Sequence, residues 1–235
     1  SEAERSRFTV LRLPMGTGND GADARELLTA LELLMGPSTF ARQRAIRVAP
    51  ATAGLAGGKG PWWAFNIASL GADAFIAEMT NRLKLTFPGD SYKFWVHLAT
   101  VFYDVLWPTR GFHIRAWDSG GREVRSFRGD LILIAMGISG RRTYGSNKPI
   151  LPDDDDTCLV RQMPFLRKLV VKGPLTKGRH RGYPEVDLFS SSRIEIDFRH
   201  RALVQMDGEA ERLDDRDFPV IFERTEPAIR VIRKA

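Results

Sequence analysis

Residues 8–20 read FTVLRLPMGTGND, and this stretch decides how the first part of the chain is expected to fold. The apolar residues within 8–13 predict a short β-strand. Gly16 and Gly18 then interrupt the pattern. From residue 24 to Met35 apolar residues recur at three- and four-residue steps, which predicts a helix that ends at Gly36. The opening is therefore predicted to be a strand, a glycine turn and a helix.

A turn of this kind can hold a phosphate group. Glycines let the backbone approach a ligand closely, and the helix behind them directs free N–H groups and its positive dipole end at the turn. Thr17 and Asn19 can add hydrogen bonds, and Asp20 can hold a ribose hydroxyl or cap the helix. The alternative is a tight strand–helix turn without a ligand, because a Gly-x-Gly pair alone specifies little.

The rest of the chain has the pattern of a β-rich domain. Short apolar segments separated by turn residues predict an antiparallel sandwich or barrel. The expected strands cover residues 44–48, 65–69, 111–117, 125–135, 193–198, 203–206 and 219–222. Two helices interrupt them. The helix near residues 90–105 is apolar almost all round and is expected to be buried, and the second covers residues 164–171.

The composition limits the classes of protein to consider. Of 235 residues, 43% are hydrophobic, as in globular domains. Cys158 is the single cysteine, so an internal disulfide is excluded, which fits a cytoplasmic protein. The net charge of +6 favours an acidic partner such as a nucleotide or an anionic membrane. Nucleic acid is not expected, because exposed aromatics among basic residues are suggested only at Trp62 and Trp63. A homodimer is compatible with the sequence.

Two blocks of opposite charge stand side by side. Residues 153–156 are four aspartates, which repel one another unless they are solvated or bound to a hard cation. Residues 157–184 contain seven basic residues and no acid. Within them, residues 163–171 interleave apolar side chains with Arg167 and Lys168. Such a helix can lie on an anionic membrane or pack its apolar side on the sandwich.

The sequence Asp207-Gly208-Glu209 follows an expected strand. Asp-Gly is a common two-residue hairpin turn. Alternatively, carboxylates two residues apart in extended chain point the same way. One could then accept a proton from a substrate hydroxyl while the other supports a magnesium-bound phosphate.

Four of these segments, in this order, resemble the catalytic fold of the diacylglycerol and sphingosine kinase family. Residues 14–20 resemble its Pro-x-Gly-Thr-Gly-Asn-Asp motif, and residues 66–74 its Asn-x-x-Ser-x-Gly-x-Asp-Ala segment. Residues 144–156 resemble its glycine-rich turn, which leads through a proline to an acidic loop. Residues 204–209 resemble its late Asp-Gly-Glu motif.

The resemblance implies an α/β plus β fold, in which a β-rich antiparallel sandwich joins a partial N-terminal α/β nucleotide-binding domain. Residues 1–44, with 226–235 returning to them, would be the remnant of the nucleotide-binding domain. Residues 45–225 would form the sandwich, the second domain of the lipid kinase. ATP would lie in the cleft between the two.

The resemblance also implies a role for individual residues. The nucleotide would contact Gly16, Thr17, Gly18, Asn19 and Asp20. The lipid would contact Asn66, Ser69 and Asp73. Catalysis would fall to Asp207 as general base, with Glu209 supporting the metal or the orientation. A magnesium ion would be held by Asp153, Asp155 and Asp156.

The implied function is that of an ATP- and Mg²⁺-dependent lipid kinase of phospholipid metabolism, cytoplasmic and peripheral to the membrane, acting on diacylglycerol or a related lipid alcohol. Two departures qualify it. The family's first motif, Gly-Gly-Asp-Gly-Thr, does not precede Phe8, so this chain alone is expected to lack kinase activity. The acidic loop continues with Thr157 where the family has glycine. The alternative is a non-catalytic β-sandwich module that binds a lipid or a partner.

Overall fold

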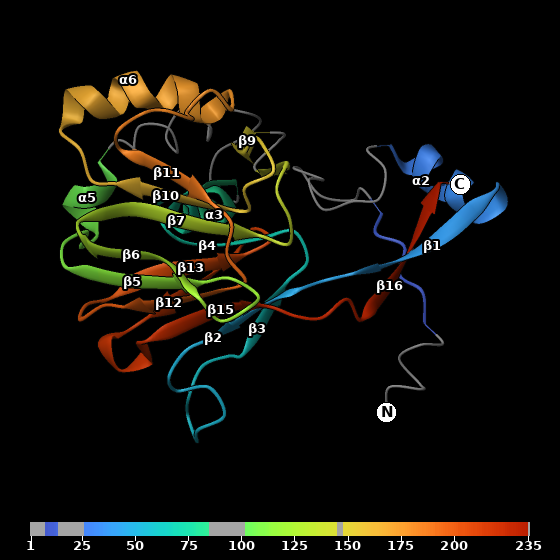
Figure 1. The fold of residues 1–235 in the computed structure, drawn as a ribbon, viewed down its shortest axis with the longest axis horizontal. Coiled ribbons are helices and arrows are strands. Elements are labelled where there is room, and N and C mark those ends of the chain that lie inside the picture. The colour runs from blue at the N-terminus through green and yellow to red at the C-terminus, as the bar shows by residue number, and fades with distance from the viewer. Residues whose placement is uncertain (1–7, 14–25, 85–101, 145–147, 235) are drawn as a thin grey trace.

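Two six-stranded antiparallel sheets form most of the computed structural model, which describes residues 8–13, 26–84, 102–144 and 148–234 (Figure 1). The first sheet has the strand order β11-β10-β7-β4-β13-β14, and the second the order β3-β2-β15-β12-β5-β6. The first comprises β4 (Ile67–Gly71), β7 (Leu131–Gly137), β10 (Thr157–Arg161), β11 (Val186–Phe189), β13 (Ala202–Met206) and β14 (Glu209–Leu213). The second comprises β2 (Ile46–Ala49), β3 (Trp62–Ala64), β5 (Phe112–Trp117), β6 (Glu123–Gly129), β12 (Arg193–Asp197) and β15 (Val220–Arg224).

Helices cover the outer face of the first sheet. They are α3 (Ala72–Lys84), α5 (Tyr103–Leu106) and α6 (Phe165–Thr176), and Figure 1 shows α6 running above β10 and β11. Leu133 of β7 faces this helical layer and packs in one cluster with Val171 of α6. Ile134, the next residue, faces the second sheet. β7 is therefore apolar on both faces, whereas β5 alternates between buried and half-buried positions because one face is covered.

The main core lies between the two sheets. Ile134 of β7, Val204 of β13, Ile114 of β5 and Phe222 of β15 are all fully buried there. Alternate residues of each strand point into this layer, as expected for two sheets packed face to face. The predicted antiparallel sandwich is confirmed, and burial of these side chains is its main source of stability.

A smaller unit lies beside the sandwich and contains both ends of the described chain (Figure 1). It holds α2 (Leu27–Met35) and the antiparallel pair β1 (Ser38–Gln43) and β16 (Ile229–Lys234). Of the strand expected at residues 8–13, a single parallel bridge is present, between Val10 and Val231. The division of the chain into domains at residue 44 stays a prediction. The remaining elements are β8 (Arg142–Tyr144), β9 (Lys148–Leu151) and the 3₁₀ turn η1 (Asp215–Asp217).

The structure splits one expected strand in two and adds a helix that the sequence analysis does not predict. Residues 125–135 were expected as one strand, but β6 ends at Gly129 and β7 begins at Leu131, and the two strands belong to different sheets. The chain crosses between the sheets at Gly129, whose φ of 154° a side chain rarely adopts. Helix α3 was not expected, because the residues of its first turn were interpreted as a binding motif and its apolar stripe is short.

The helix expected over residues 90–105 lies mostly outside the described residues. Its described part is α5, and here the expectation of burial is wrong. Val105 is 78% exposed and Phe102 is 43% exposed, while Tyr103 and Trp107 point into the core. Within the described ranges, no helix is long and apolar enough to cross a membrane.

The position of Ile134 gives a test of the sandwich. Replacing Ile134 with Ala should lower the free energy of unfolding by about 2–5 kcal/mol, because a fully buried side chain leaves a cavity between the sheets. Leu55→Ala is the matched control, since Leu55 is 64% exposed, and it should change stability by less than about 0.5 kcal/mol. Urea denaturation measures both. Equal effects would contradict the described core.

Candidate functional site

The Asp207-Gly208 turn joins β13 to β14 as a two-residue hairpin. Met206 pairs with Glu209 across the turn, and both central residues have positive φ, 53° at Asp207 and 99° at Gly208. These are the angles of a primed hairpin turn, which aspartate followed by glycine adopts readily. The hairpin interpretation of this motif is therefore correct for the backbone.

The Asp207 side chain does more than complete the turn. Its carboxylate reaches the connection between β3 and β4 and accepts the backbone N–H groups of Phe65 at 2.5 Å, Asn66 at 2.9 Å and Ile67 at 3.0 Å. Burial raises the pKa of Asp207, and the three N–H groups oppose that rise. The carboxylate therefore links two turns that are far apart in the sequence. Its oxygens accept hydrogen bonds from backbone N–H groups.

Glu209, the other carboxylate of the motif, has a different environment. It is exposed at the first position of β14. Among the described residues, no hydrogen bond or ion pair engages its carboxylate. Of the two predicted catalytic acids, Glu209 is thus the one whose carboxylate is available to a molecule approaching the turn.

A buried polar network lies behind this turn. Asp73, in the first turn of α3, accepts hydrogen bonds from the Ser69 hydroxyl at 2.6 Å and the Gln205 amide at 3.1 Å. Gln205 also donates to Ser69 at 2.9 Å, and its carbonyl accepts the N–H of Gly208 at 2.7 Å. The network therefore connects the start of α3 to the Asp207-Gly208 turn.

Asp73 is almost completely enclosed by this network. Burial raises the pKa of Asp73 to about 6, and hydrogen bonds from Ser69, Tyr144 and Gln205 oppose the rise. A neighbouring group, Asn66, donates its amide to the Thr143 carbonyl at 2.9 Å, while its own Oδ1 is buried without a partner. A buried acceptor without a donor is rare in folded proteins and often indicates a site for water or a ligand.

The structure thus gathers Asn66, Ser69, Asp73 and Asp207, which the sequence separates by up to 141 residues. Sequence analysis missed Gln205 and Tyr144. The signal for Gln205 was its position as the one polar residue in the apolar strand Ala202–Met206. The predicted nucleotide contacts Gly16, Thr17, Gly18, Asn19 and Asp20 lie outside the described residues.

Arg12 lies in the described segment 8–13, which precedes those nucleotide contacts in the sequence, and it bonds to the β3–β4 connection. Its guanidinium donates to the Phe65 carbonyl at 3.3 Å and to Gln43 Oε1 at 3.1 Å. Arg233 donates to the same Gln43 oxygen at 3.1 Å. Burial lowers the pKa of Arg142, and the charges of Arg12 and Arg233 lower it further. Arg12 and Arg233 therefore meet at Gln43, whose amide donates to the Phe65 carbonyl of the turn that Asp207 holds, and Arg142, which donates to Ser139, is near enough for their charges to act on it.

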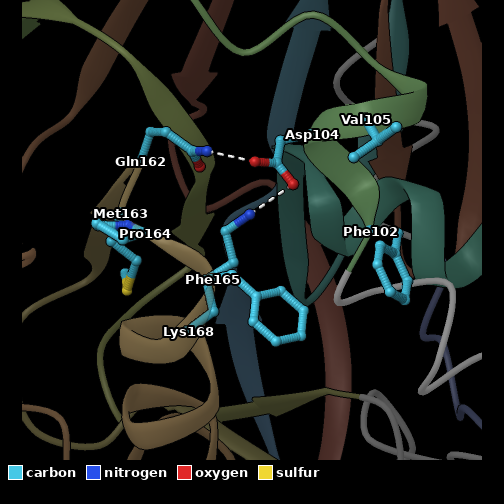
Figure 2. Close-up of a pocket in the computed structure, with 8 residues that line it drawn as sticks. All are labelled: Phe102, Asp104, Val105, Gln162, Met163, Pro164, Phe165 and Lys168. Atoms are coloured by element: carbon cyan, nitrogen blue, oxygen red, sulfur yellow. Dashed lines mark hydrogen bonds and ion pairs between the residues drawn. The ribbon is translucent and has the colours of Figure 1, made fainter.

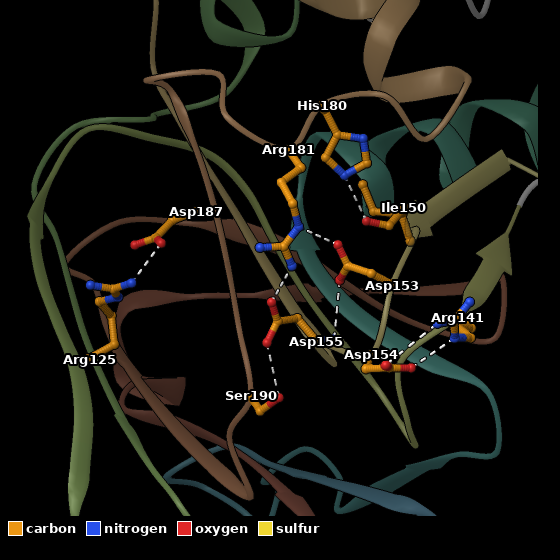
Figure 3. Close-up of polar contacts among 10 residues, drawn as sticks. All are labelled: Arg125, Arg141, Ile150, Asp153, Asp154, Asp155, His180, Arg181, Asp187 and Ser190. Carbon is orange, nitrogen blue, oxygen red and sulfur yellow. Dashed lines mark hydrogen bonds and ion pairs between the residues drawn. The ribbon is translucent and has the colours of Figure 1, made fainter.

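The acidic run between β9 and β10 is neutralised by arginines (Figure 3). Arg181 forms ion pairs with both Asp153 and Asp155. Arg141 pairs with Asp154 at 2.8 Å, and its N–H donates to the Asp153 carbonyl. Each of these three carboxylates therefore already has a cationic partner from the chain itself.

Asp156 is buried and has a separate partner. Arg224 Nη1 lies 2.5 Å from one of its oxygens, and the backbone N–H of Ser191 donates to the other at 2.9 Å. No group of three or more metal-ligating side chains occurs in the part of the chain that the structure describes. The predicted magnesium set, Asp153, Asp155 and Asp156, does not fit a bound ion in this arrangement, because guanidinium groups take the place that a cation would need.

Comparison with known proteins gives a fold likeness only. No family model and no curated protein matches the sequence. A solved diacylglycerol kinase from Bacillus anthracis strain Sterne matches 96% of this chain and 67% of its own length, with a TM-score of 0.55 and 12% identity. Two structures described as candidate diacylglycerol kinases from the same strain match with TM-scores of 0.59, at 16% and 14% identity. They too are matched over 96% of this chain, and over 69% and 68% of their own lengths.

The chain has the fold of these bacterial kinase structures. The likeness extends over the sandwich and the small unit alike, because it covers nearly all of the chain. In this kinase-like fold, the site described above occupies the β3–β4 and β13–β14 turns and the start of α3.

The raised pKa of Asp73 predicts a pH dependence of stability. The folded state holds the proton more tightly than the unfolded state, so the free energy of unfolding should fall as pH rises from about 4 to about 6. The loss should reach up to about 3 kcal/mol. Asp73→Asn should abolish this component. The free energy of unfolding of the variant should therefore rise relative to that of the wild type as the pH increases over that interval. Urea denaturation at several pH values measures it, and parallel profiles would contradict the burial of an ionisable Asp73.

The arginine pairs predict the response of the acidic run to magnesium. Millimolar Mg²⁺ should leave the melting temperature of the wild type unchanged, because the carboxylates are already paired. Arg181→Gln should lower the melting temperature and introduce a rise with Mg²⁺, because it frees Asp153 and Asp155. Arg179→Gln, a neighbouring exposed arginine, is the control and should behave as the wild type. A Mg²⁺-induced rise in the wild type that Arg181→Gln leaves unaltered would restore the metal interpretation.

Proposed function

We propose that this chain belongs to an ATP-dependent lipid kinase, which transfers the γ-phosphoryl group of ATP to the hydroxyl of diacylglycerol or a related lipid alcohol. One observation carries the proposal. The motif residues Asn66, Asp73 and Asp207, identified separately in the sequence, meet in one hydrogen-bonded site on a fold shared with bacterial diacylglycerol kinases. A structural hairpin alone would not require the buried network behind it.

The nucleotide side is supported by the arginines that converge beside the β3–β4 turn. Arg12 is two residues from Pro14, where the predicted phosphate turn begins. Arg142 and Arg233 add positive charge at the same place. Phosphoryl transfer depends mainly on positioning and on neutralising phosphate charge, which guanidinium groups do well. ATP would bring Mg²⁺ with its phosphates, and the ion would neutralise charge at the transferred group.

The lipid side is supported by the polar groups behind the turn. Asp73 is positioned by Ser69 and Gln205, and the unpartnered Asn66 Oδ1 is an acceptor that a hydroxyl donor would satisfy. Gln205 links Asp73 to the Gly208 N–H. We place the lipid head group here, at the cytoplasmic surface of a membrane that the protein meets peripherally.

The geometry favours Glu209 over Asp207 as the proton acceptor. The lipid hydroxyl oxygen attacks the γ-phosphorus, the bond between that phosphorus and the bridging oxygen breaks, and ADP leaves with the bond electrons. The hydroxyl proton passes to a carboxylate within reach. Both residues are exposed, but the Asp207 carboxylate is engaged by three N–H groups, whereas no group in the described ranges pairs with the carboxylate of Glu209. Asp207 then acts by holding the turn that aims Glu209.

Substitutions at the turn test both roles in the protein as its gene encodes it, with labelled ATP and a panel of lipid alcohols. Glu209→Gln should lower kcat by about 10²- to 10⁴-fold with an unchanged melting temperature, as expected for loss of a general base. Asp207→Asn should lower both kcat and melting temperature, because it sets an amide against backbone N–H donors. Glu211→Gln, exposed two residues farther along β14, is the control.

One result would overturn the proposed activity, and a second would reassign its general base. A wild-type protein that phosphorylates no lipid in the panel would favour the non-catalytic sandwich module. Near wild-type kcat in Glu209→Gln, with a large loss in Asp207→Asn at unchanged stability, would return the base to Asp207.

A further inference from the structure

Helix α6 buries Val171 against the first sheet, but it also pairs two of its cations with acids of the protein and leaves several apolar side chains exposed. Arg167 pairs with Glu185 at 2.6 Å, and Lys168 pairs with Asp104 at 2.5 Å with its side chain only 14% exposed (Figure 2). On the other side of the helix, Leu166 is 75% exposed. An ordinary surface helix solvates its charges and exposes few apolar side chains, so the exposed apolar residues of α6 need an explanation.

The exposed apolar residues of α6 continue onto α5. The rings of Phe102 and Phe165 lie 5.9 Å apart, and Lys168 joins the two helices through Asp104. An open hollow of about 360 Å³ lies between the helices. We call the outward-facing set the α5–α6 apolar face. It consists of Val105, Leu106, Phe165, Leu166, Leu169 and Val170. Contiguous exposed apolar surface of this kind usually marks an interaction site.

Positive charge lies at both ends of α6. Three of the seven basic residues in 157–184 form ion pairs with acids outside that stretch, namely Arg167, Lys168 and Arg181. Exposed Arg161 precedes α6, and exposed Lys177 and Arg179 follow it. In the described ranges no acid pairs with these last three.

We propose that the α5–α6 apolar face docks on an anionic lipid bilayer. The twelve-residue α6 would lie in the plane of the interface, with Leu166, Leu169 and Val170 among the acyl chains. Arg161 at one end, and Lys177 and Arg179 at the other, would meet the anionic headgroups. The biological role of this contact rests on the proposed function, because a lipid kinase must reach a substrate held in the bilayer.

Charge distinguishes the bilayer from a second copy of the chain. A symmetric contact between two copies would bring the same face of each together. Both copies would then present Arg161, Lys177 and Arg179 at the contact, and the net charge of +6 on each would oppose association. An anionic bilayer offers apolar chains and negative headgroups together, which matches both features of the face.

Flotation with phosphatidylglycerol–phosphatidylcholine vesicles tests the proposal without any activity measurement. The wild-type protein should bind, and Leu166→Gln/Val170→Gln should weaken binding by about tenfold or more, because two apolar side chains lose their burial in the interface. Glutamine keeps the charge unchanged and favours helix, so circular dichroism and melting temperature should not change. The control is Leu55→Gln/Met35→Gln, at residues 64% and 91% exposed on other elements, and it should bind as the wild type.

Other outcomes overturn the proposal. If the wild type does not bind the vesicles, or if the α6 double variant binds them equally well, the α5–α6 apolar face does not dock on a bilayer. A wild-type dimer in sedimentation that the α6 variant converts to monomer, with vesicle binding unaltered, would assign the face to a second copy. Vesicle binding that depends on α6 in a protein without lipid kinase activity would sustain this inference while the proposed function fails.

Discussion

The site depends on one interaction, the contact between the Asp207 carboxylate and three consecutive backbone N–H groups at residues 65–67. A carboxylate that accepts several N–H groups forms strong, directional hydrogen bonds. It joins the β13–β14 hairpin to the β3–β4 connection, which are far apart in the sequence but adjacent in space, because β13 pairs with β4 in the first sheet. Because these hydrogen bonds occupy the Asp207 carboxylate, the exposed Glu209 is the carboxylate of the turn that no described residue engages.

The buried network supports the same arrangement from behind. Gln205 uses both ends of its amide, donating to Asp73 and accepting from Gly208. A glutamine inside an apolar strand is costly unless its groups are paired, and here the pairing fixes the turn relative to α3. Burial in this network raises the pKa of Asp73.

Elsewhere the chain neutralises its acids with arginine. Arg141, Arg181 and Arg224 each engage part of the acidic run. A guanidinium group offers several fixed donors and can bridge two carboxylates, as Arg181 does. Ion pairs also hold α6, because Arg167 and Lys168 in its first turn pair with Glu185 and Asp104. Leu166, Leu169 and Val170 stay exposed, while Val171 packs on the sheet.

The sequence by itself determined the features that depend on near neighbours along the chain. Short apolar segments between turn residues predicted strands such as β5, the Asp207-Gly208 pair predicted its hairpin, and the order of four motifs predicted the kinase-like fold. Only the tertiary structure decided what these side chains contact. The Asp207 bonds span about 140 residues, and the partner of Lys168 comes from a helix some 60 residues earlier. Local periodicity carries no information on such pairs, because they are set by the order of strands in two packed sheets and by which face of each strand the helices cover.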